Sequence, residues 1–94
     1  MVLTQGTLVQ IVDAGWVYPS YYRLAEKLQL RKWRERKRDL TNMLLYRVGI
    51  VIHVVRNHKP CNETILAIDL GDEQVLVGPD GLERIHSLKY TLLK

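Results

Sequence analysis

Short β-branched runs between glycine-containing turns limit how this chain of 94 residues can fold. Runs of roughly four to eight such residues, bounded by Gly, Asp or Pro, are typical of β-strands. The runs at residues 64–70 and 74–77 are joined by Gly71-Asp72-Glu73, which predicts a hairpin. We expect strands at residues 7–13, 48–55, 64–70, 74–77 and 82–85. Sequential strands in so short a chain predict a mainly β fold, a small antiparallel barrel with a helical insertion after the first strand.

The helical insertion is expected because the apolar periodicity changes after Pro19. Apolar residues recur at three- and four-residue spacing there, namely Tyr21, Leu24, Ala25 and Leu28. This spacing forms one apolar stripe on a helix, and Ser20 is a suitable residue to cap its first turn. We expect the helix to run from about Tyr21 into a basic segment, so that residues 1–94 form a single domain with a helical and basic insertion at about residues 20–40.

The basic segment is an octapeptide, Arg31-Lys32-Trp33-Arg34-Glu35-Arg36-Lys37-Arg38, with six cations and one acid. The remainder of the chain holds eight Lys and Arg against nine Asp and Glu, so the net charge of +4 is local to the octapeptide. On a helix its cations would be scattered over all sides. A segment charged on every side cannot pack flat against a core, so we expect it to project, to fray or to be covered by another molecule, and its charge indicates a partner.

The beginning of the chain resembles a known group of proteins. The pattern Gly6-x-x-Val9-x-Ile11-x-Asp13-x-Gly15, followed by Tyr18-x-x-Tyr21, is similar to that of small SH3-like β-barrel proteins of bacteriophage genomes. The resemblance implies the barrel fold and a viral origin. It implies no activity for any individual residue.

Non-catalytic binding is the function that we expect, and nucleic acid is the first candidate partner. Six cations can neutralise phosphates, and Trp33 can stack on an unpaired base. An acidic protein surface is the second candidate, and the alternative function is a phage-type protein that inhibits or redirects a host protein. The expected contact residues are Arg31, Lys32, Trp33, Arg34, Arg36, Lys37, Arg38, Trp16 and Tyr22.

Neither catalysis nor a cofactor is expected from the polar residues. Asp13, Asp69, Asp72 and Asp80 lie beside turn glycines, where Asp is common because it makes local hydrogen bonds. His58 and Cys61 are three residues apart in an expected polar loop at 57–62, but a zinc ion needs further ligands and a nucleophilic pair needs an orienting group. By strand alternation, His53 is expected to share a face with Val51 and Val55 and to have a structural role.

The cysteine content and the apolar segments of the sequence bear on the location and assembly of the protein. One cysteine excludes an internal disulfide, and no secretory segment or long apolar run is visible, so we expect a cytoplasmic protein without a membrane partner. If the protein is viral, the compartment would be the host cytoplasm. The pair Leu92-Leu93 is a candidate contact for a homodimer.

Overall fold

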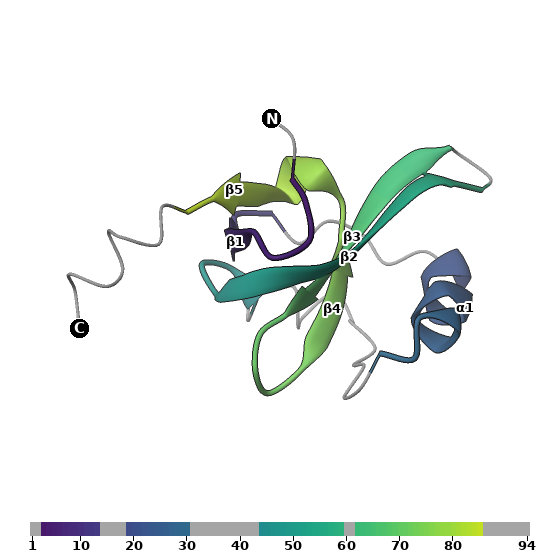
Figure 1. The fold of residues 1–94 in the computed structure, drawn as a ribbon, viewed down its shortest axis with the longest axis horizontal. Helices are drawn as coiled ribbons and strands as arrows, with labels where there is room; N and C mark the ends of the chain where they lie inside the picture. The colour runs from purple at the N-terminus through teal and green to yellow at the C-terminus, as the bar shows by residue number, and fades with distance from the viewer. Residues whose placement is uncertain (1–2, 14–18, 31–43, 60–61, 86–94) are drawn as a thin grey trace.

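A computed structural model describes residues 3–13, 19–30, 44–59 and 62–85. The described residues include a five-stranded antiparallel sheet and the α-helix α1 (Figure 1). The strand order is β4-β3-β2-β1-β5. The elements are β1 (Leu8–Ile11), α1 (Pro19–Lys27), β2 (Val48–His58), β3 (Glu63–Asp69), β4 (Gln74–Val77), the 3-10 turn η2 (Pro79–Gly81) and β5 (Leu82–Arg84).

The mainly β fold and the order of its elements are confirmed, but the sheet is not a closed ladder. β4 and β5 are its two edges, and the strand pairing within the described residues does not join them. The sheet instead curls around a shared core, because residues of both edge strands lie in one apolar cluster. We call this cluster the sheet core, and it consists of Leu3, Val9, Ile11, Leu44, Val51, Leu66, Ile68, Val75, Val77 and Leu82.

The helix covers the opposite face of β3 and β4. Strand alternation sends Leu66 and Ile68 into the sheet core and Ile65 and Ala67 toward α1, so β3 is buried on both faces. Figure 1 shows α1 beside the β2–β3 ribbon and away from β1 and β5. We call this second cluster the helix-side cluster, and it consists of Tyr21, Leu24, Ala25, Ile65, Ala67 and Leu76.

The helix ends earlier than the sequence pattern predicts. Its last turn is closed by two backbone hydrogen bonds, from Leu30 N–H to the Ala25 carbonyl and from Gln29 N–H to the Glu26 carbonyl, both 3.0 Å. Gln29 has φ 54°, and together these features form a Schellman cap. The prediction of a helix that continues into the basic segment is therefore wrong. Its N-terminus is also earlier, because Pro19 starts the helix, as suits a residue with a fixed φ and no N–H, and Ser20 lies within the first turn.

Strand β2 is longer than predicted and changes its facing along its length. Register shifts occur between Val51 and His53 and between Val55 and His58, because β2 has an extra residue at each place. Val51 is buried in the sheet core, whereas Val55 packs against the helix-side cluster. His53 is half-buried and pairs with Ala67 on the helix side. The expectation that His53 shares a face with Val51 is therefore wrong, because the bulge reverses the alternation.

The remaining strands agree closely with the sequence. β4 has the predicted bounds, and Leu70 N–H donates to the Glu73 carbonyl at 2.9 Å across the predicted hairpin turn. Asp69 Oδ1 accepts a hydrogen bond from Gly71 N–H at 2.8 Å, the local turn interaction expected of such an aspartate. The predicted loop at 57–62 is partly wrong, because β2 continues through His58.

Candidate anion-binding groove

A groove of about 360 Å³ lies between α1 and the end of β2. Three of its lining residues come from the helix, and five come from consecutive positions on and just after the strand. The lining residues are Arg23, Leu24, Lys27, Val55, Arg56, Asn57, His58 and Lys59. The groove therefore joins two segments that are about thirty residues apart in sequence.

The helical side of the groove follows from the amphipathic pattern of α1. Tyr21, Leu24 and Ala25 are buried against the sheet, and Arg23 and Lys27 are exposed. Residues four apart lie one above the other on a helix surface. Arg23 and Lys27 therefore form one rim of the groove, while Leu24 lies at the junction with the sheet.

The strand side is formed where β2 extends past its second bulge. Arg56 and Lys59 are exposed, and Asn57 between them has φ 56°. Lys59 Nζ donates a hydrogen bond to Asn62 Oδ1 at 2.6 Å, which links the strand end to the start of β3. This segment supplies the opposite rim, with two further cations.

His58 fixes the strand end to the helix. Its ring centroid lies 6.3 Å from that of Tyr21 at an interplanar angle of 69°, an edge-to-face arrangement. Among the described residues, its Nε2 is buried and has no hydrogen-bond partner. A buried nitrogen without a partner is uncommon in folded proteins, but this atom has no solvent contact, so we assign it no ligand.

The electrostatic character of the groove is uniform. Four of its eight lining residues are Lys or Arg, and none is Asp or Glu. Glu26 on α1 and Glu63, which pairs with His58, are close in sequence or register but do not line it. Converging like charges create a positive potential that attracts anions. The chemistry of the groove is therefore that of anion binding.

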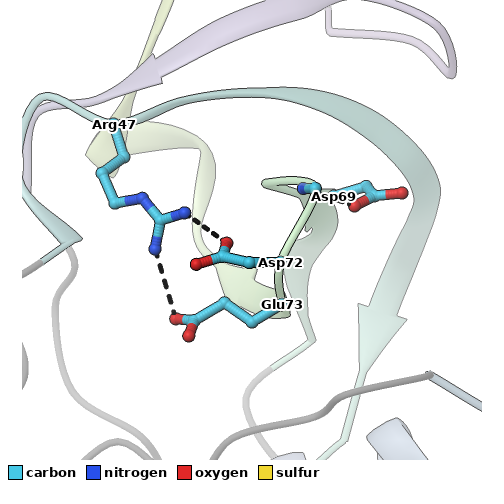
Figure 2. A network of polar contacts seen from close by, with 5 residues as sticks. Arg47, Asp69, Asp72 and Glu73 are labelled. Atoms are coloured by element: carbon cyan, nitrogen blue, oxygen red, sulfur yellow. Dashed lines mark hydrogen bonds and ion pairs between the residues drawn. The ribbon is translucent and has the colours of Figure 1, made fainter.

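A second polar cluster, formed by Arg47, Asp72 and Glu73, lies at the turn between β3 and β4 and has a structural role. Arg47, just before β2, donates to Asp72 and also lies 3.7 Å from Glu73, measured from Nη1 to Oε1 (Figure 2). The hydrogen bond from Arg47, together with its positive charge, lowers the pKa of Asp72 below its ordinary value of 3.8. Glu73 is only 8% exposed, so Arg47 provides countercharge to a buried carboxylate.

Most of the contact residues predicted from the sequence lie outside the described residues. This holds for Trp16 and for Arg31, Lys32, Trp33, Arg34, Arg36, Lys37 and Arg38, and likewise for Cys61 and Leu92-Leu93. Tyr22 is described and is 39% exposed on α1, but it does not line the groove. The described chain stops at Leu30, just beyond Lys27, and the octapeptide is the next segment in the sequence.

Sequence reasoning missed the groove because its cations are dispersed. Arg23 and Lys27 have the spacing of neighbours on one helix face, and this was the available signal. Arg56 and Lys59 lie in what the sequence suggested to be a strand end and a loop. Only the pairing of β2 with β3, together with the packing of α1 on β3, brings the two pairs to one place.

The described residues contain no group of three His, Cys, Asp or Glu side chains arranged to hold a metal ion. The one described α-helix is too short to cross a membrane. No protein-family model, curated protein or solved structure matches the chain. The groove therefore has to be interpreted from its own geometry.

Proposed function

We propose that this protein is a non-catalytic binding module that holds nucleic acid through the basic groove and the octapeptide at residues 31–38. One observation carries the proposal: a concave site of about 360 Å³ with two cations on each rim and no carboxylate among its lining residues. Every nucleotide of a polynucleotide carries an anionic phosphate group. Lys and Arg that contact phosphates release counterions, which makes binding favourable and dependent on salt.

The octapeptide adds to the same proposal at the level of sequence. It supplies six cations and Trp33 directly after the described end of the α1 segment at Leu30. Its cations follow Lys27 closely in the sequence, so they add to the number of Lys and Arg side chains available to neutralise phosphates.

The fold assignment within this proposal is an SH3-like barrel of the kind found in small bacteriophage proteins. It is supported by the strand order, with β1 between β2 and β5, and by the 3-10 turn that joins β4 to β5. Gly81 allows that turn to approach β1 closely: its carbonyl accepts from Val12 N–H at 2.9 Å, and a Cβ on Gly81 would lie 1.9 Å from the Asp13 carbonyl oxygen. The shared sheet core then curls the open sheet into a barrel-like form.

A second candidate function is docking on a host protein, and a different surface favours it. Tyr46 is 70% exposed and donates its N–H to the Ile11 carbonyl, and Ile50 is 47% exposed and pairs with Leu8. Val12, just after β1, is also exposed. Exposed aromatic and aliphatic side chains are typical anchors of protein interfaces. This candidate predicts affinity that depends on these residues and changes little with salt.

Fluorescence-anisotropy titration with random-sequence oligonucleotides at two salt concentrations tests the proposal. Three variants accompany the wild type: the groove variant Lys27→Glu/Arg56→Glu, the octapeptide variant Arg34→Glu/Arg36→Glu/Arg38→Glu, and the control Arg84→Glu on β5. The altered described side chains are exposed, so the fold should be retained. We expect salt-sensitive binding that both basic variants weaken and the control retains. Absence of wild-type binding at low salt would overturn the proposal.

A further inference from the structure

We infer that the groove between α1 and β2 seats one unpaired nucleotide, so that the protein prefers single-stranded over double-stranded nucleic acid. This inference rests on the proposed nucleic-acid binding and specifies the form of nucleic acid that the groove accepts.

The walls of the groove are mainly carbon, although its rims are charged. Leu24 and Val55 contribute apolar side chains, and lysine and arginine stems add methylene groups below their charged ends. A surface that binds only phosphates needs no apolar recess. A ligand that combines an anion with a flat apolar ring matches both parts of the groove, and a nucleotide is such a ligand.

The size of the groove also fits one nucleotide. Its volume of about 360 Å³ is near the lower end of sites for small organic ligands, roughly 300–1,000 Å³. It lies between a helix and a strand and is partly open to solvent. A base that has left its stack can occupy such a recess, as unpaired bases do in proteins that recognise single strands.

The cations lie on two sides of this recess rather than in one cluster. Arg23 and Lys27 line the helix side, and Arg56 and Lys59 line the strand side. This arrangement allows the phosphates before and after a seated base to be neutralised by different rims. In a duplex the bases are stacked and paired in the interior, so it offers the groove phosphates but no base face.

The experiment compares three labelled probes of equal length in the same buffer: a thymidine oligomer, a random-sequence duplex, and an abasic strand with the same phosphates but no bases. The proteins are the wild type, the rim variant Lys27→Ala/Arg56→Ala and the matched control Arg84→Ala. All three altered residues are exposed, and Arg84 lies on β5, separated from β2 by β1.

We expect the wild type to bind the thymidine oligomer roughly tenfold more tightly than the abasic strand, the gain expected when part of the apolar surface of one base is removed from water against Leu24 and Val55. The duplex should also bind more weakly than the oligomer. The rim variant should lose affinity for all probes, and Arg84→Ala should match the wild type.

Equal affinity for the oligomer and the abasic strand, or tighter binding of the duplex, would overturn this inference and leave nucleic-acid binding itself intact. Absence of binding to all three probes at low salt would instead overturn the proposed function.

Discussion

Gly49 and Asp69 approach so closely across β2 and β3 that a Cβ on Gly49 would lie 2.6 Å from the Asp69 carbonyl oxygen. The same added atom would lie 2.6 Å from Cγ2 of Ile68, a buried residue of the sheet core. A side chain at position 49 would therefore disturb the pairing of β2 with β3. The other end of β2 carries the strand rim of the groove.

Gly49→Ala is therefore expected to destabilise the fold. The backbone oxygen cannot move without disturbing the ladder, so we expect the free energy of unfolding to fall by about 1–3 kcal/mol, the usual range for overpacking. Urea denaturation followed by circular dichroism measures this change. Gly78→Ala is the matched control, since no atom lies within 4 Å of its added Cβ and its φ is −71°. An equal loss in both variants would contradict the role assigned to Gly49.

Gln29→Gly is expected to stabilise the protein. Gln29 caps α1 with φ 54°, a conformation that glycine adopts without the steric cost borne by other residues. The free energy of unfolding should rise by at most about 1 kcal/mol, because glycine also raises the entropy of the unfolded chain. Thermal denaturation of both proteins measures it.

Glu26→Gly is the control for that substitution, because Glu26 is an exposed residue inside the same helix. There glycine should lower the free energy of unfolding by about 1 kcal/mol. The opposite signs at positions 26 and 29 are the expected result. A lower free energy of unfolding in both variants would contradict the assignment of Gln29 as the residue that caps α1.

The pairing of Arg47 with Asp72 predicts an effect of pH on stability. The pKa of Asp72 is lower in the folded protein than its ordinary value of 3.8, because Arg47 donates a hydrogen bond to it. A carboxyl group with a lowered pKa contributes stability above its unfolded pKa and loses it as the pH falls through the folded pKa. Asp72→Asn should therefore be less stable than the wild type near neutral pH. The difference should begin to shrink as the pH falls below about 3.8 and should be lost as the pH passes the lower pKa of Asp72 in the folded protein.

Urea unfolding of both proteins between neutral pH and pH 3 tests this prediction. Asp72 is exposed, so a small difference is expected. Asp80→Asn, an exposed aspartate in the 3-10 turn, serves as the comparison. A difference between wild type and Asp72→Asn that persists unchanged at pH 3 would contradict the ion pair as its cause.

Single alanine substitutions in the groove predict a graded change in salt dependence. Each of Arg23→Ala, Lys27→Ala, Arg56→Ala and Lys59→Ala should reduce the slope of log affinity against log salt by about 0.7 for a single strand, if that cation contacts a phosphate. Arg84→Ala should leave the slope unchanged. Slopes that stay equal to the wild type in all four groove variants would exclude phosphate contacts in the groove.

The strands could be predicted from sequence because their signals are local. The β4 run at 74–77 holds the β-branched residues Val75 and Val77, and Gly71 and Asp72 just before it are suited to a turn. The end of α1 could not be predicted in this way, because Gln29 takes the capping position where glycine is the usual signal. The bulges in β2 could not be predicted either, since Val51, Ile52, Val54 and Val55 are all apolar and the run shows no alternation that would reveal a change of register.

The candidate site was less predictable than the fold because it depends on contacts between distant segments. The sequence directs attention to the octapeptide, where the cations are consecutive. The groove uses two pairs of cations, on α1 and at the end of β2, that no single window contains. Its formation requires both the helix-side cluster and the β2–β3 register.

The most direct test of the central claim is an amide proton–nitrogen NMR titration of the wild-type protein with a short thymidine oligomer. We expect saturable chemical-shift changes at the backbone amides of residues 23–27 and 55–59. The chemical shifts of β5 amides such as that of Arg84 should stay unchanged. Saturable binding that leaves the amides of both groove segments unperturbed would contradict the assignment of the groove as the nucleic-acid site.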